Sequence, residues 1–151
     1  MAINSRSKGQ RGEREVRDLL QKVMDDAGRQ LNLLFVPEVK RNLMQSMQGG
    51  HDLVNIPGLA VEVKFQENLQ VDKWWEQCLR QAGTVGNQPV LIYRKKNAKW
   101  KVRMWAQLPG EFSVAADFTA DEFLLWFDGY LTAYWRANPP SSESIFSDKN
   151  V

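Results

Sequence analysis

The chain has 151 residues, of which 43% are hydrophobic, and its formal net charge is +2. That length and composition suit one ordinary domain with its own core. The single cysteine and the single histidine exclude an internal disulfide and a Cys/His zinc cluster. The first residues lack the apolar stretch of a signal peptide, and no apolar run could cross a bilayer, so we expect a soluble, cytoplasmic protein without membrane contact.

Charged residues divide the chain into a basic part and an acidic part. Residues 1–108 contain 18 Lys and Arg against 11 Asp and Glu, whereas residues 109–151 contain 2 against 7. A basic body attracts polyanions, but solvated surface lysines would give the same balance. Charge alone therefore leaves nucleic-acid binding open.

Periodicity and turn residues predict alternating helices and strands. Apolar residues three and four apart indicate helices, and β-branched or alternating runs indicate strands. Pro57-Gly58 favours a tight turn, and Thr119 with Glu122 fits a capping box. In chain order we expect a helix over 8–28, a strand over 31–39, a polar loop up to residue 50, a hairpin over 51–56 and 59–66, a helix over 72–82, strands over 89–94 and 100–108, and a helix over 120–138.

This order of elements predicts an α/β fold with a mixed central β-sheet flanked by helices. We expect one domain over residues 1–138 and a flexible C-terminal tail over residues 139–151. No internal repeat is found, which disfavours a solenoid or a propeller.

The strongest chemical signal is Asp52 followed, after nine residues, by Glu62-Val63-Lys64. Side chains alternate between the two faces of a strand, so Glu62 and Lys64 share one face while Val61 and Val63 share the other. If the predicted turn folds the preceding strand back, Asp52 comes near Glu62. The hairpin would then place two carboxylates beside an ammonium group.

Two close carboxylates repel each other, which raises the pKa of one of them unless a cation neutralises the pair. Carboxylate oxygens suit Mg²⁺ or Mn²⁺. Such an ion would acidify a bound water and polarise a phosphate, while Lys64 would position the water or offset charge in the transition state. The pattern is therefore typical of phosphodiester hydrolysis. A surface hairpin with a simple pair between Glu62 and Lys64 is the alternative.

A second Glu-x-Lys sequence, Glu38-Val39-Lys40, shows how common this short pattern is. Asp25 and Asp26 precede it at workable distances, but they lie near the end of the first predicted helix rather than on a neighbouring strand. Because such a motif needs structural context, the set built on Asp52 is preferred.

Charged residues at the start of the first helix add support. Glu13 continues the apolar stripe of this helix, so its carboxylate faces the sheet and could either cap the helix or reach the metal. Cations surround it, although a helix start disfavours positive charge. A bound phosphate would relieve that conflict. These cations are Arg6, Lys8, Arg11, Arg14 and Arg17.

Three segments occur in an order that a known family shares: Lys8-Gly9-Gln10-Arg11-Gly12-Glu13-Arg14-Glu15, Gly50-His51-Asp52-Leu53 and Val61-Glu62-Val63-Lys64. Together they resemble the Holliday-junction resolvase branch of the PD-(D/E)xK nucleases of archaea and phages. The resemblance implies a restriction-endonuclease-like fold, hydrolysis that leaves a 5′-phosphate, Mg²⁺ with Mn²⁺ as a substitute, and a homodimer. For a phage-encoded chain it implies the host cytoplasm.

The resemblance also implies roles for single residues. Lys64 corresponds to the catalytic lysine. A glutamine on the following helix would fall at Gln77 or Gln81, and Gln77 is preferred as a catalytic residue. His51 stands where the family name has a proline, and it is either a turn residue or a phosphate contact. The implied metal ligands are Glu13, Asp52, Glu62 and the carbonyl of Val63.

The predicted hairpin over 89–94 and 100–108 carries six cations without an acid between Arg94 and Arg103, together with Trp100 and Trp105. Such cations bind phosphates without reading sequence, but lysines also protect exposed strand edges. The residues expected to contact DNA are Lys8, Arg11, Arg14, Arg17, His51, Arg94, Lys95 and Lys96.

The last predicted helix carries an aromatic stripe that suits core packing, while tryptophans on its flanking faces favour a subunit interface. The stripe comprises Phe123, Phe127, Tyr130 and Tyr134, and the flanking residues are Trp126 and Trp135.

We expect an endonuclease that resolves branched DNA, such as four-way junctions, in recombination and repair. A general, repair or flap nuclease acting on duplex, nicked or linear DNA is the alternative. A DNA-binding protein without activity is disfavoured, because Asp52, Glu62 and Lys64 are all present.

Overall fold

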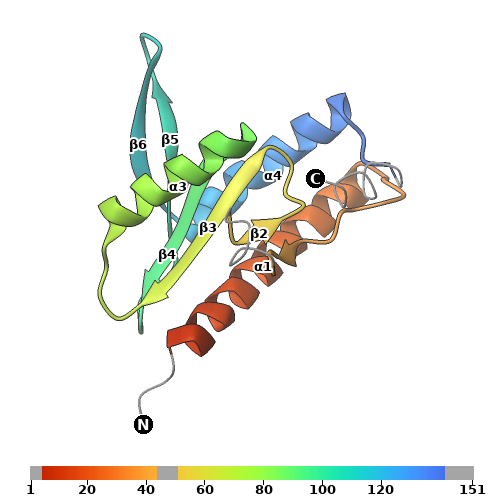
Figure 1. Ribbon diagram of the computed structural model, residues 1–151. Helices are drawn as coiled ribbons and strands as arrows, with labels where there is room; N and C mark the ends of the chain where they lie inside the picture. The colour runs from red at the N-terminus through yellow and green to blue at the C-terminus, as the bar shows by residue number, and fades with distance from the viewer. Residues whose placement is uncertain (1–4, 44–50, 142–151) are drawn as a thin grey trace.

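A mixed β-sheet runs through the molecule with helices on both faces (Figure 1). The computed structural model describes residues 5–43 and 51–141. Within them the strand order is β1-β2-β3-β4-β5-β6, and the β3–β4 pair alone is parallel. The elements are α1 (Ser5–Gln30), β1 (Lys40–Arg41), β2 (Leu53–Val54), β3 (Leu59–Gln66), α3 (Val71–Val85), β4 (Gln88–Lys95), β5 (Lys101–Leu108), β6 (Phe112–Thr119) and α4 (Ala120–Ala137). This arrangement confirms the predicted α/β fold.

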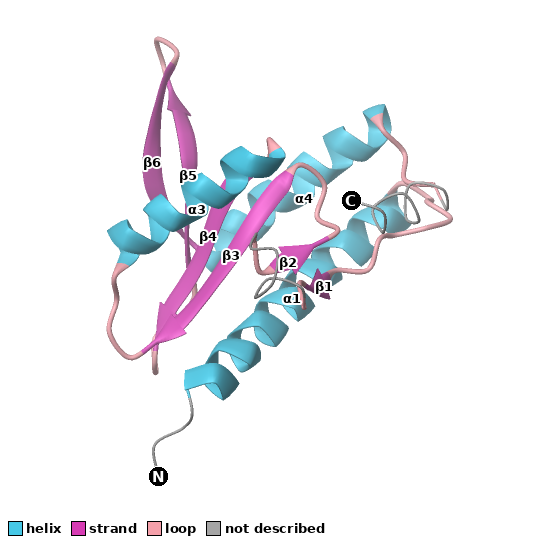
Figure 2. Ribbon diagram, in the orientation of Figure 1, coloured by secondary structure: helices cyan, strands magenta, loops and turns pink. Residues whose placement is uncertain are grey.

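The two faces of the sheet bury different helices (Figure 2). Val61 and Val63 of β3 join the core that contains the buried residues of α1 and α4. The opposite face packs against α3, where Leu91 of β4 contacts the apolar side of that helix. Because side chains alternate along a strand, Glu62 and Lys64 lie on the α3 face. The predicted division of β3 into two faces is confirmed.

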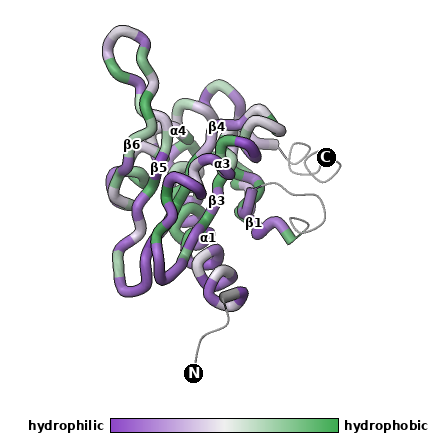
Figure 3. The backbone as a smooth tube through the Cα atoms, turned by 60° about the vertical axis from the view of Figure 1, so that its left-hand side comes forward, coloured by the Kyte–Doolittle hydropathy of each residue, from purple (hydrophilic) through white to green (hydrophobic). Residues whose placement is uncertain are grey.

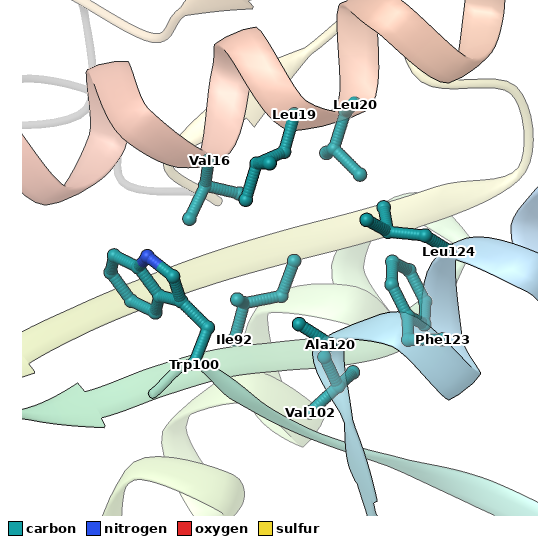
Figure 4. A pocket seen from close by; sticks show the side chains of 9 residues that line it. All are labelled: Val16, Leu19, Leu20, Ile92, Trp100, Val102, Ala120, Phe123 and Leu124. Atoms are coloured by element: carbon teal, nitrogen blue, oxygen red, sulfur yellow. The ribbon is translucent and has the colours of Figure 1, made fainter. Parts of the chain in front are cut away.

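A small apolar cavity of about 10 Å³ lies between α1, the sheet and α4 (Figure 4). Leu20 and Phe123 are among its lining residues and are buried. A volume this small and apolar does not hold an ordered water. It is a packing defect in the core rather than a ligand site.

The predicted strand over residues 31–39 is wrong. After α1 the chain turns back on itself at Asn32, which has a positive φ, and the N–H of Leu33 donates to the carbonyl of Gly28. Val36 then covers the end of α1 so closely that a methyl group at Gly28 would collide with it. The apolar residues of this segment therefore serve to cover a helix instead of pairing in a sheet.

The strand β6 was absent from the sequence prediction. It pairs along its whole length with β5, from Lys101 opposite Thr119 to Leu108 opposite Phe112. The turn between them uses Gly110 and Glu111, both with positive φ. Most of β6 is exposed, so it lacks the alternation of buried and exposed positions that identifies a strand in a sequence.

The helix α4 begins with the predicted capping box, in which the Thr119 side chain and Glu122 bond each other's backbone N–H groups. Its aromatic residues divide differently from the prediction. Trp135 is buried in the core, so its placement on a flanking face was wrong. Trp126 is exposed, as expected for a flanking residue.

The predicted domain boundary at residue 138 and the flexible tail stay predictions. The last helix ends at Ala137, and residues 142–151 of that tail lie outside the described residues, as do residues 44–50 of the predicted loop. None of the helices in the described ranges is long and apolar enough to cross a membrane.

Gly12 sets the distance between α1 and β3. A methyl group at this position would lie 2.9 Å from Phe65 Cβ and 3.3 Å from Trp100 Cη2. Both distances are shorter than ordinary carbon contacts. Glycine therefore allows the helix to lie directly on the sheet, and this close approach positions Glu13, the next residue.

We predict that Gly12→Ala destabilises the protein by about 1–3 kcal/mol because the added methyl overpacks this contact. Alanine would otherwise favour the helix by about 1 kcal/mol. Gly9→Ala is the control, since a methyl there meets no atom within 4 Å, and it should be neutral or stabilising. Urea unfolding of both variants measures the difference. Equal stabilities would argue against close packing at Gly12.

Candidate active site

Asp52, which immediately precedes β2, forms two hydrogen bonds with the backbone of β3. Its N–H donates to the carbonyl of Val61 at 3.0 Å, and its Oδ2 accepts from the N–H of Val63 at 2.7 Å. Since β2 has only two residues, the Asp52 side chain replaces the backbone that a longer strand would offer to Val63. Asp52 is 6% exposed, so its carboxylate is held in a buried position at the edge of β3.

Glu62 is the most deeply buried charged residue of the site, with 1% of its surface exposed. No N–H or O–H group of the described residues donates to either of its carboxylate oxygens, and the Asp52 carboxylate lies within reach of a proton that the two acids could share. Burial, and after it the negative charge of Asp52, raise the pKa of Glu62 to about 9 against the opposing charge of Lys64. Without a cation Glu62 is therefore protonated at neutral pH. Burying an acid that no N–H or O–H group of the described residues stabilises costs free energy of folding.

Glu13 reaches the same site from α1. Its carboxylate accepts a hydrogen bond of 2.7 Å from Nε of Arg41. Burial raises the pKa of Glu13 and so does the charge of Asp52, while Arg41 and Lys64 lower it. The structure thus brings Glu13, Asp52, Glu62 and Lys64 into one electrostatic cluster, as the sequence predicted.

The carboxylates of this cluster are oxygen ligands of the kind that divalent metals take, but three of them do not converge on one position. Across residues 5–43 and 51–141 no three His, Cys, Asp or Glu side chains gather closely enough to hold a metal ion. Asp52 and Glu62 form a pair, and Glu13 is engaged by Arg41. The four oxygens of the pair, two of them without donors, still fit a hard divalent cation.

The sequence assigned three further residues to the site, namely Gln77, Val63 and His51. Gln77 and Gln81 are half-buried on α3, the helix that covers the Glu62 face, and Oε1 of Gln81 has no partner in the described part of the chain. The Val63 carbonyl stays a predicted ligand. His51 is half-buried, and burial lowers its pKa although Asp52 opposes the shift, so its ring is neutral at pH 7.

Arg41 and Asn42 belong to the site, and the sequence analysis missed both. The N–H of Asn42 donates to the Asp52 carbonyl at 2.8 Å, and its Nδ2 donates to the His51 carbonyl at 3.0 Å. These contacts join segments that are distant in sequence. Neither residue belongs to a recognisable motif, so only the folded chain reveals them.

The alternative set around Glu38 does not assemble. Glu38 is exposed and lies before β1 rather than in a strand. Asp25 accepts a hydrogen bond from Gln21, and Asp26 pairs with Arg29. The carboxylates of Asp25 and Asp26 are therefore engaged by neighbours on α1.

Arg94 lies on β4, and its side chain packs against residues of the sheet and of α1. Its guanidinium lies 3.9 Å from the centre of the Phe65 ring and 5.0 Å from that of Trp100. It also donates to both oxygens of Glu15, at 3.3 and 3.1 Å, and Trp100 Nε1 donates to the same carboxylate. Arg94 thus clamps α1 onto the sheet. Its contact with DNA stays a prediction.

The other cations predicted to contact DNA lie along the start of α1 and at the turn after β4, two hydrophilic stretches (Figure 3). Lys8 pairs with Glu67, Arg11 with Glu15 and Arg17 with Asp18. The remaining three, all exposed, are Arg14, Lys95 and Lys96. Exposed cations at both places leave a basic surface available to phosphates.

Comparisons with known proteins identify the family of this chain. The model of a family described as "Phage putative PDDEXK endonuclease" matches residues 4–114. Protein D14 of Escherichia phage T5 is 29% identical over 125 aligned residues, which cover 69% of this chain and 72% of that protein. The solved structure of Hjc, a Holliday junction resolvase from Archaeoglobus fulgidus, aligns with a TM-score of 0.47 and 18% identity over 78% of this chain and 98% of the other.

We predict that Glu62→Gln stabilises the metal-free protein more strongly as pH rises. In the wild type Glu62 stays protonated up to a pKa of about 9 when folded, but ionises near its ordinary value of 4.5 when unfolded. The folded state binds more protons between these values, so wild-type stability falls with rising pH by up to about 1.4 kcal/mol per unit. Glutamine removes that dependence. Urea unfolding with chelator, between about pH 5 and 8, should show diverging curves, and parallel curves would refute the shift.

We predict that Arg94→Met lowers the free energy of unfolding by about 1–3 kcal/mol, because it removes the Arg94 hydrogen bonds to Glu15 and the stacking on Phe65 and Trp100. Lys96→Met is the control, since Lys96 is exposed beyond the end of β4, and it should change stability by less than about 0.5 kcal/mol. Chemical denaturation of both variants compares them. An equally small effect of both changes would show that the Arg94 contacts contribute little.

Proposed function

Because this chain belongs to the phage PDDEXK endonuclease family, we propose that it is a metal-dependent DNA endonuclease whose active centre is Asp52, Glu62 and Lys64. One observation carries the proposal: Glu62 is buried beside Asp52 and Lys64, and no described residue other than the acid Asp52 is a hydrogen-bond partner of its carboxyl group. A purely structural acid would be hydrogen-bonded or replaced by an apolar residue. An acid whose role is to bind a cation has a reason to lack a hydrogen-bond donor.

The proposed metal is Mg²⁺, with Mn²⁺ as a substitute. Asp52, Glu62 and the carbonyl of Val63 would hold it, and Glu13 would join them. A bound divalent ion supplies an acidified water and a polarised phosphate. The bond between Asp52 Oδ2 and the Val63 N–H orients the Asp52 carboxylate towards Glu62 before any ion arrives.

Lys64 contributes a positive charge on the same face of β3 as Glu62. Its ammonium would stabilise the negative charge that develops on the phosphate during hydrolysis and would orient the attacking water. Gln77 from α3 is proposed to position the same water, and neutral His51 to contact a phosphate. The roles of Gln77 and His51 follow from the family resemblance, and that of Lys64 is also supported by its electrostatic effect on Glu62.

The proposed substrate is branched DNA, and the proposed assembly is a homodimer that cuts two strands of a junction. The basic start of α1 and the turn after β4 would bind phosphates through Lys8, Arg11, Arg14, Arg17, Lys95 and Lys96, with Arg94 behind them. Such contacts select by shape rather than by sequence. Trp105 and Trp126, each 39% exposed beside a groove of about 330 Å³, support a subunit contact. Recombination and repair in the host cytoplasm are the corresponding proposed setting.

We predict that Glu62→Gln and Lys64→Met each lower Mg²⁺-dependent DNA cleavage by about 100-fold or more, because the first removes a carboxylate that would hold the metal and the second removes the positive charge that would stabilise the transition state. Glu76→Gln and Lys73→Met are matched controls on the exposed side of α3 and should keep wild-type rates. Cleavage of labelled DNA is measured under single-turnover conditions. Unchanged rates for the Glu62 variant would overturn the site assignment.

The substrate is tested with labelled four-way junction, flap, nicked and plain duplex DNA, each with Mg²⁺ and with chelator. We expect the junction to be cut fastest, with paired cuts in opposing strands. Equal cleavage of duplex would favour a general nuclease. Tight DNA binding without cleavage of any substrate would identify a binding protein and reject the proposed activity.

A further inference from the structure

Arg41 forms an ion pair with Glu13 inside the cluster. The two side chains come from β1 and α1, and Nε of the arginine lies 2.7 Å from Oε2 of the glutamate. They are only 19% and 18% exposed. Charge-assisted hydrogen bonds are stronger than neutral ones, and partial burial reduces screening by salt. The pair therefore competes effectively with other partners of Glu13.

Backbone pairing holds Arg41 at this position. Arg41 lies opposite Leu53 in the β1–β2 ladder, next to Asp52. The following residue, Asn42, bonds the backbone of Asp52 and of His51 on the same segment. The Arg41 guanidinium is therefore carried by a strand whose backbone is hydrogen-bonded to the segment that contains Asp52. Arg41 can leave Glu13 only by changing its side-chain conformation.

The charges around Glu13 show what Arg41 does. Glu13 lies in the negative field of Asp52, and Arg41 and Lys64 are the positive groups that oppose it. In this arrangement Glu13 does not combine with Asp52 and Glu62 into a group of three that could hold a metal, as far as the described residues show. Arg41 supplies to Glu13 the positive charge that a divalent ion would otherwise supply.

We infer that Arg41 is a competing counter-ion for Glu13: it neutralises this carboxylate in the metal-free protein, and it must release Glu13 before that side chain can join a divalent cation. The inference rests on the proposed metal site at Asp52 and Glu62. Arg41 consequently lowers the affinity of the site for the metal. It is a positioning residue that acts through Glu13.

The test measures Mn²⁺ binding by calorimetry and electron paramagnetic resonance in the absence of DNA. Arg41→Met should tighten binding about three- to tenfold, the range expected for a partly exposed ion pair. Arg41→Gln, which keeps a donor for Glu13 but no charge, should give an intermediate affinity and serves if the first variant folds poorly. Arg29→Met is the control, because Arg29 forms an exposed pair with Asp26, about 24 Å along α1 from Glu13, and its affinity should equal that of the wild type.

A double-mutant cycle separates action through Glu13 from general repulsion of the ion. In the Glu13→Gln background, Arg41→Met should leave the Mn²⁺ affinity unchanged. Persistence of the full effect in that background, or no tightening in the wild-type background while Glu62→Gln still weakens binding, would overturn the inference and leave the proposed function intact. Absence of any Glu62-dependent Mn²⁺ binding would overturn both.

Discussion

The hydrogen bond from the Val63 N–H to the carboxylate of Asp52 is the interaction on which the candidate site depends. The strand β2 is too short to pair with this part of β3, so an acidic side chain takes the place of backbone. The same bond that satisfies a buried N–H therefore fixes one carboxylate next to another. Structure and function share a single contact here, because the edge of β3 would otherwise be left unpaired.

The site concentrates unfavourable charge in a place with little exposure to water. Glu62 is buried and receives no hydrogen bond from an N–H or O–H group of the described residues, and Asp52 lies close enough to raise its pKa. Lys64 and Arg41 belong to different elements and offset part of this charge: Lys64 acts on Glu62 and Glu13, and Arg41 pairs with Glu13. The metal-free protein is thus held in a partly neutralised state, as expected for a site that gains its full stability with a ligand.

Two contacts hold α1 on the sheet so that Glu13 reaches the other acids. Gly12 lets the helix approach Phe65, and Arg94 joins that ring and Trp100 to Glu15. An arginine that sequence reasoning assigns to DNA is thereby also part of the packing between helix and sheet. The basic surface and the active centre are consequently linked through one helix, whose first turns carry the cations and whose inner side carries Glu13.

The sequence by itself determined the local features, because these depend on spacing over a few residues. The two faces of β3, the capping box at Thr119 and the segment Glu62-Val63-Lys64 follow from periodicity and neighbouring side chains. Only the tertiary structure decided that residues 31–39 cover a helix, that β6 extends the sheet, and that Arg41 pairs with Glu13. These contacts join distant or exposed segments, and their free energy depends on which surfaces the whole fold brings together rather than on local pattern.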